Sequence, residues 1–228
     1  MRLPSSVRPE RRTLNIIGES PEMKPLTGTI VAASVVAIVA GCASMRDADI
    51  AKQATDMLRA SFNERGQAKL DRLNQDGPQA QCSISDGTAL PKDMAEALEK
   101  AQLALIKYPA DGMLLGDWRE GEKIAQTGVG KQFSDNPATP AGGNCYACHQ
   151  ISPQEISYGT IGPTLLGYGK LRGNSEAIQK YTYGKVYNPQ AYSACSNMPR
   201  FGHNGILTEK QLKDVTALLL DPASPVNK

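Results

Sequence analysis

The sequence predicts a mainly α fold, and two features of the chain carry that prediction. The stretch Thr208-Glu209-Lys210-Gln211 has the form of a capping box, in which an N-cap hydroxyl and a Gln side chain satisfy otherwise free N–H groups of a first helical turn. Apolar residues then recur at helical spacing as far as Pro222, namely Leu212, Val215, Leu218 and Leu219. No segment shows the sustained alternation of apolar and polar residues that is typical of a strand.

Three further helical segments are expected upstream. Residues 48–74 are charged and Ala-rich with apolar residues at roughly helical spacing, interrupted at Gly66, and a Gly-Pro turn at 77–78 closes this run. A second helix is expected over 91–107, and the apolar residues that share one of its faces are Met94, Leu98, Ala101 and Leu105. The third runs from Asp117 to Gln126, where Asp117 is a suitable N-cap and Ile124 points inward.

The rest of the chain reads as loop. Residues 128–144 are rich in Gly, Pro, Ser and Asn, and residues 150–205 are loop-like except for a short helical stretch near 174–181. The chain has only three Phe and one Trp among 228 residues, against 21 Gly and 15 Pro. This composition indicates many loops, or a core filled by something other than aromatic side chains.

Length and charge exclude several classes of protein. A chain of 228 residues allows one ordinary domain with a tail, or two small domains. With 25 basic and 23 acidic residues, it has no strong field that would attract nucleic acid.

The N-terminal region has the pattern of an export signal. Residues 27–40 are uncharged, too few for a membrane span of about 20 residues but suited to the apolar part of a signal peptide. Lys24 precedes this stretch, and Val39-Ala40-Gly41-Cys42 follows it and resembles the lipobox of bacterial lipoproteins, in which the Cys is lipidated. Ordinary signal-peptidase cleavage near Ala43 is the alternative, since Gly41 and Ala43 are both small.

Residues 1–22 fit this signal poorly, and Met23 is the better start. The signal peptide is interpreted as residues 1–41, with Met23 as its alternative start. Cutting before Cys42 leaves 187 residues with 20 basic and 20 acidic side chains. The mature protein is thus expected to be nearly neutral and exported to the periplasm, where disulfides persist, either free or anchored by lipid.

Cys145-Tyr146-Ala147-Cys148-His149 has the C-x-x-C-H form of a c-type haem attachment motif. Two thiols at this spacing reach the two vinyl groups of the haem, and the adjacent His faces the iron. Zinc binding would require further Cys or His ligands at suitable spacing, and a redox dithiol would sit in a βαβ context, which the sequence lacks. The motif therefore predicts one covalently bound haem c, held by Cys145 and Cys148, with His149 as an iron ligand.

Two downstream motifs resemble those of class I cytochromes c. In Gly162-Pro163-Thr164-Leu165 the resemblance implies that the Pro carbonyl accepts the His149 N–H and orients the ring. Met198-Pro199-Arg200-Phe201-Gly202 is similar to the loop that supplies the sixth ligand, which implies Met198, with His203 as the rival. The class I fold then occupies residues 116–228, its last helix packing across the helix before the haem motif, and residues 43–115 form a helical N-terminal extension.

Cys82 and Cys195 remain after the other cysteines are assigned to haem or to the N-terminal signal. A disulfide between them is expected in an oxidising compartment, and it would stiffen the loop that bears Met198. Two buried free thiols, or one reactive thiol, are the alternatives.

Longer stretches of the chain resemble one family in particular, SoxX, the monohaem cytochrome subunit of the sulfur-oxidising SoxAX complex. The stretches that carry the resemblance are GQAKLDRLNQD at 66–76, GEKIA at 121–125, GGNCYACHQ at 142–150, IGPTLLGYG at 161–169 and MPRFGHNGILTEKQLKDVTALLLDPASPVN at 198–227. A lipobox at Cys42 is not expected of a soluble SoxX.

This resemblance implies a partner and a pathway. SoxA would be the heterodimer partner and would carry the catalytic cysteine of an L-cysteine S-thiosulfotransferase, which couples thiosulfate to a cysteine of the carrier SoxYZ. The present chain would have no catalytic residue: it would accept the electrons and pass them to a small cytochrome c. A stand-alone electron shuttle is the alternative, and it predicts a charged docking rim, for which Lys170, Arg172, Lys180 and Lys185 are candidates. A haem-based sensor would require a weak sixth ligand.

Overall fold

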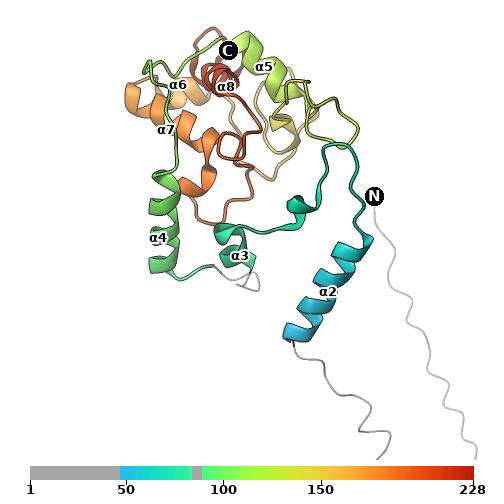
Figure 1. The fold of residues 1–228 in the computed structure, drawn as a ribbon. Helices are drawn as coiled ribbons and strands as arrows, with labels where there is room; N and C mark the ends of the chain where they lie inside the picture. Colours follow the sequence, from blue (N-terminus) through green and yellow to red (C-terminus); the bar gives the residue numbers. More distant parts are fainter. Residues whose placement is uncertain (1–46, 84–88) are drawn as a thin grey trace, which may run out of the picture. The chain divides into compact units, whose positions relative to one another are not determined.

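The computed structural model describes residues 47–83 and 89–228 (Figure 1). The predicted signal peptide at 1–41 and Cys42 lie outside the described residues. The helices are α2 Asp47–Ser61, η1 Leu70–Leu73, α3 Gly77–Ser83, α4 Lys92–Leu103, α5 Trp118–Gln126, η2 Cys145–Ala147, α6 Tyr168–Arg172, α7 Glu176–Tyr187, η3 Pro189–Ala191, α8 Glu209–Leu220 and η4 Pro225–Asn227. Within the described residues no strand forms, and the mainly α prediction is confirmed; one isolated bridge joins Arg65 and Ala68.

The chain divides into two units, 1–55 and 56–228, with the division inside α2. The features described below belong to the second unit. Of the helices within 47–83 and 89–228, none combines the length and the apolar character that a membrane crossing requires.

The two helices predicted most definitely, α5 and α8, pack against each other (Figure 1). The Asp117 side chain caps α5 by accepting the Arg119 N–H at 2.9 Å. Thr208 and Gln211 form the predicted capping box of α8. The side chain of Asp214, in α8, accepts the Asp117 N–H at 2.9 Å, which ties the start of α5 to α8.

The core consists of two apolar clusters, with α8 contributing to both. One joins α7, α8 and the segment that carries Phe201 and Leu207, and it includes Tyr183, Tyr187, Leu212 and Val215. The other lies beside the Cys145–Ala147 turn, and its buried members are Ala125, Tyr146, Ile151, Leu218, Leu219 and Val226. The predicted stripe of α8 is buried in full.

Some local predictions are wrong in their bounds or faces. The Gly-Pro pair at 77–78 was expected to form a turn that ends the upstream helical run. It begins the helix α3 instead, because Pro is well tolerated in the first turn of a helix. The helix α4 ends at Leu103, and it buries Leu98 and Gln102 while Met94 is exposed. The short helical stretch expected near 174–181 is the longer helix α7, whose second half is buried in the core.

Candidate haem site

A largely apolar cavity of about 760 Å³ lies beside the C-x-x-C-H motif. It is lined by four segments of the chain, at 143–149, 161–172, 181–186 and 193–201, together with Leu219 of α8. Cavities of several hundred Å³ with apolar walls and a few polar groups are typical of cofactor sites. The size and the apolar lining of this cavity suit a flat, largely apolar macrocycle such as haem.

The C-x-x-C-H motif forms one tight turn on the cavity wall. The N–H groups of Cys148 and His149 both donate to the Cys145 carbonyl, at 3.1 and 2.9 Å. Asn144, just before the turn, has the left-handed φ of 46° and donates its N–H to the Thr127 carbonyl at 2.8 Å, next to the end of α5. Local hydrogen bonding therefore brings both thiols and the imidazole to the same cavity.

The ring of His149 is oriented by the Gly-Pro turn that follows it. Its Nδ1 lies 2.7 Å from the Pro163 carbonyl oxygen, so Nδ1 is the donor and Nε2 retains its lone pair. The Gly162 N–H donates to the Cys148 carbonyl at 2.9 Å. A Cβ at Gly162 would overlap the imidazole ring, so only glycine allows this approach. This geometry agrees with the role that the Gly-Pro-x-Leu resemblance implies.

Met198 lies on the wall of the same cavity, and it is half-buried against the core. Its N–H donates to the Ser196 hydroxyl oxygen at 3.3 Å. The rival His203 does not line the cavity; its N–H donates to the Tyr187 carbonyl at 3.1 Å, and burial lowers the pKa of its imidazole. The structure therefore brings His149 and Met198 to one site and leaves His203 outside it.

The alternatives for the C-x-x-C pair do not fit these surroundings. Within the described residues, no three His, Cys, Asp or Glu side chains gather in a way that would hold a metal ion. Desolvation raises the pKa of the Cys145 thiol to about 12, whereas redox-active dithiols have a lowered thiol pKa. The apolar cavity, the two thiols and the oriented imidazole fit a haem attached through Cys145 and Cys148.

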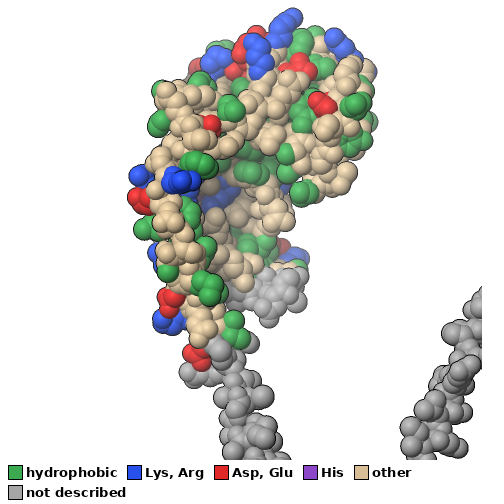
Figure 2. Space-filling model, turned by 90° about the vertical axis from the view of Figure 1, so that its right-hand side faces the viewer, with side chains coloured by type: hydrophobic (Ala, Val, Ile, Leu, Met, Phe, Trp, Pro, Cys, Tyr) green, Lys and Arg blue, Asp and Glu red, His purple; other side chains and the backbone are tan. Residues whose placement is uncertain are grey.

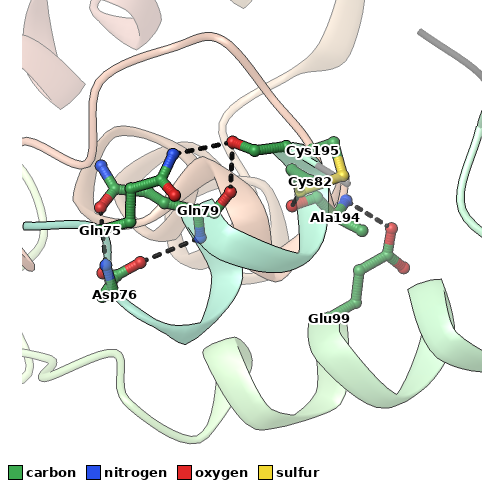
Figure 3. Close-up of a disulfide and its surroundings, with 8 residues drawn as sticks. Gln75, Asp76, Gln79, Cys82, Glu99, Ala194 and Cys195 are labelled. Atoms are coloured by element: carbon green, nitrogen blue, oxygen red, sulfur yellow. Dashed lines mark hydrogen bonds between the residues drawn. A yellow bond between two sulfur atoms is a disulfide. The ribbon is translucent and has the colours of Figure 1, made fainter. Parts of the chain in front are cut away.

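Cys82 of α3 and Cys195 form a disulfide, with an S–S distance of 2.08 Å and a Cα–Cα distance of 5.5 Å (Figure 3). The bond joins the predicted extension to the loop that carries Met198. Of the alternatives left open by the sequence, the structure contains the bridged form.

Sequence reasoning missed the part of the cavity wall that comes from α6 and α7. Tyr181 and Val186 line the cavity, although no motif marks them, and Lys185, which the sequence offered only as a candidate for a docking rim, lines it as well. Burial lowers the pKa of Lys185, whose ammonium donates to the Pro189 carbonyl at 3.4 Å. These residues reach the cavity because α7 packs beside the haem motif. Local sequence spacing does not predict this packing.

Comparison with known proteins defines the class. Residues 119–221 match the sequence profile of the cytochrome c family. Over 139 residues the chain is 43% identical to an uncharacterized lipoprotein of Aquifex aeolicus (strain VF5), an alignment that covers 60% of this chain and 64% of that protein. The match thus spans less than two thirds of the length of that relative.

The matched segment, residues 119–221, is a cytochrome c domain. A cytochrome c domain implies one covalently bound haem c and haem-based electron transfer. The haem prediction and the class I fold are confirmed at this level.

Proposed function

We propose that this chain is the electron-accepting subunit of a SoxAX-type complex, with haem c joined to Cys145 and Cys148 and with His149 and Met198 as axial ligands. The observation that carries the ligand assignment is that His149 and Met198 line one apolar cavity beside the attachment motif. His and Met ligands fill both axial positions of haem iron and raise its reduction potential. This favours electron transfer over the sensor alternative.

The haem, when bound, supplies a one-electron redox centre. The residues of the chain hold and tune that centre: Pro163 fixes the orientation of His149, and the apolar wall excludes water from the iron. Among the described residues, the only cysteines that line the cavity are Cys145 and Cys148, and the haem would use both thiols. We therefore assign the catalytic cysteine to a SoxA-type partner.

In the proposed reaction, a thiol of a SoxYZ-type carrier and thiosulfate form a new sulfur–sulfur bond. This releases one proton and two electrons. The haem that Cys145, Cys148, His149 and Met198 would hold accepts one electron at a time, so the two electrons would leave singly to a small cytochrome c.

Two features support a partner complex over a stand-alone shuttle. Ile161 and Leu171 line the cavity and are nonetheless 78% and 82% exposed, so apolar side chains lie at its mouth. Exposed apolar side chains at the mouth of a site are typical of a surface that a partner protein covers. On the face shown in Figure 2, basic and acidic side chains are interspersed, whereas a shuttle would favour a field of one sign.

We also propose that the mature chain starts at Cys42 and is held at the periplasmic side of a membrane by a lipid on that residue. The lipobox-like Val39-Ala40-Gly41-Cys42 supports this, as does the name of the Aquifex relative, which is called a lipoprotein. In this proposal residues 43–115 extend a cytochrome domain at 116–228.

The test is purification of the tagged full-length chain, in mild detergent, from cells grown with and without thiosulfate. We expect a second haem-stained polypeptide at fixed stoichiometry, identified by mass spectrometry as a SoxA-type cytochrome. Ile161→Lys and Leu171→Lys should weaken its retention about tenfold. Ile156→Lys is the matched control, because Ile156 is 92% exposed but does not line the cavity.

A single haem band from thiosulfate-grown cells would contradict the complex and favour the shuttle. Equal loss of the partner in all three variants would argue against docking at the cavity mouth.

A further inference from the structure

The helix α3 contacts the loop that bears Met198 at two points. We define the methionine loop as residues 193–200. On one side of Met198, the disulfide joins Cys82 to Cys195 (Figure 3). On the other side, the Arg200 guanidinium donates to the carboxylate of Asp76, just before α3, at 2.5 Å. The two links lie three residues before Met198 and two residues after it, and they bracket it.

The ion pair is unusual because its basic partner is buried. The Arg200 side chain is 6% exposed, and within the described residues its Nη1 atom has no hydrogen-bond partner. Asp76 is held ready for it: its carboxylate accepts the Gln79 N–H at 3.0 Å, and its own N–H donates to the Gln79 side chain at 2.9 Å (Figure 3). Removing the carboxylate would leave a buried cation without its counter-charge, which is strongly unfavourable.

Between Ser193 and Met198, the hydrogen bonds described within the loop itself join near neighbours. The Ser196 N–H donates to the Ser193 carbonyl at 3.0 Å, and the Met198 N–H donates to the Ser196 hydroxyl oxygen. A further support comes from α4, where the Glu99 carboxylate accepts the Ala194 N–H at 3.0 Å (Figure 3). The position of Met198 on the cavity wall therefore depends on elements that lie more than 90 residues earlier in the chain.

We propose that Asp76 and the Cys82–Cys195 disulfide are positioning residues of the haem site, which hold the methionine loop closed and so set how readily Met198 leaves the iron. This inference rests on the proposed ligation by Met198. A loop opens locally with its own free energy, and links to a neighbouring element raise that energy. An external ligand binds iron only in the open form, so its apparent affinity rises in proportion to the open fraction.

The test is an imidazole titration of the oxidised, haem-loaded full-length protein. Displacement of Met198 is followed by the loss of the sulfur-to-iron charge-transfer band. We expect the Cys82→Ser, Cys195→Ser double variant to bind imidazole about tenfold more tightly than the wild type, and Asp76→Asn several-fold more tightly. Asp76→Glu should restore most of the wild-type affinity, since it keeps the counter-charge.

Asp111→Asn is the matched control. It removes another ion pair between distant segments, that of Asp111 with Lys213 at 3.0 Å, and neither residue lies in the methionine loop. This variant should bind imidazole as the wild type does. Should the double cysteine variant not fold, Asp76→Asn and Asp76→Glu still test the proposal, because they leave the disulfide in place.

Two negative outcomes are distinguishable with Met198→Ala. In the first outcome, Met198→Ala loses the band, but Asp76→Asn and the double cysteine variant bind imidazole as the wild type does. The positioning role of Asp76 and the disulfide is then wrong, and the ligand assignment stands. In the second outcome, Met198→Ala keeps the band. The ligand assignment is then wrong, and so is the positioning role that rests on it.

Discussion

Gly162 lies against the imidazole ring of His149, in a position that no larger residue can take without moving the ring. The same turn presents the Pro163 carbonyl to Nδ1 at 2.7 Å. The two contacts fix both the direction of the ring and its tautomer, the two properties that decide whether an imidazole can bind iron. At the scale of single residues, the orientation of the proposed ligand His149 thus depends on the absence of a Cβ at position 162.

Gly162→Ala should disturb the haem site. The new Cβ must displace the His149 ring or the turn, which we expect to cost about 1–3 kcal/mol and to reduce the low-spin haem fraction. Visible absorption spectra and the haem content per chain would measure this. The control is Ile156→Ala, which trims a side chain that is 92% exposed and does not line the cavity. A normal spectrum at full haem content for Gly162→Ala would contradict the expectation.

At the scale of elements, α5 and α8 meet backbone to backbone. A Cβ at Gly121 would overlap the Asp214 carbonyl oxygen and lie 3.0 Å from the Leu218 Cβ. The Gly116 N–H donates to the Lys213 carbonyl at 3.0 Å, beside the contact between Asp117 and Asp214. The turn at Cys145–Ala147 is hydrogen-bonded to the end of α5. The close packing of α5 against α8 therefore fixes the position of this turn.

Gly121→Ala should force α5 and α8 apart. In a helix interior alanine is intrinsically favoured over glycine by about 1 kcal/mol, so a net loss of stability would isolate the steric effect. We expect a loss of about 1–3 kcal/mol in urea denaturation. Gly77→Ala, at a helical glycine with nothing within 4 Å of its Cβ, should be neutral or stabilising. Equal effects of the two exchanges would show that the crossing tolerates a methyl group.

At the scale of the whole molecule, the segment at residues 56–115 belongs to the same compact unit as the residues that line the cavity. The Gln67 side-chain amide donates to the Asp135 carbonyl at 3.1 Å, in the loop that leads to the haem motif. Farther along, the Asn188 amide donates to the Gln102 side chain at 2.9 Å in a buried contact between α4 and the end of α7. Together with the disulfide, these contacts hold the segment against both loops that flank the cavity.

Replacing Cys82 and Cys195 by Ser should lower the free energy of unfolding by about 2–5 kcal/mol, since the bridge spans 113 residues. Covalent haem should remain, because its thioethers involve other cysteines. Thermal unfolding and haem staining after denaturing electrophoresis would measure the two effects. Intact mass after alkylation, with and without prior reduction, would verify the pairing in the wild type. A melting temperature equal to that of the wild type would contradict the structural role of the bridge.

The features that depend on near neighbours could be predicted from the amino-acid sequence. The C-x-x-C-H turn, the Gly-Pro turn, the Asp117 cap and the Thr208 capping box each form within a few residues, so their spacing reports them directly. The buried stripe of α8 follows from the same short-range periodicity. These features were sufficient to predict a mainly α cytochrome c domain and one haem c.

The tertiary structure decided what depends on residues far apart in the chain. Counting left the pairing of Cys82 with Cys195 open, and no pattern marked Asp76 as the partner of Arg200 or Tyr181 as part of the cavity wall. The face that α4 buries and the length of α7 also escaped prediction, because tertiary packing overrides local preference. Such contacts are set by the free energy of burying surfaces that meet only after the chain has folded, and local spacing carries no record of them.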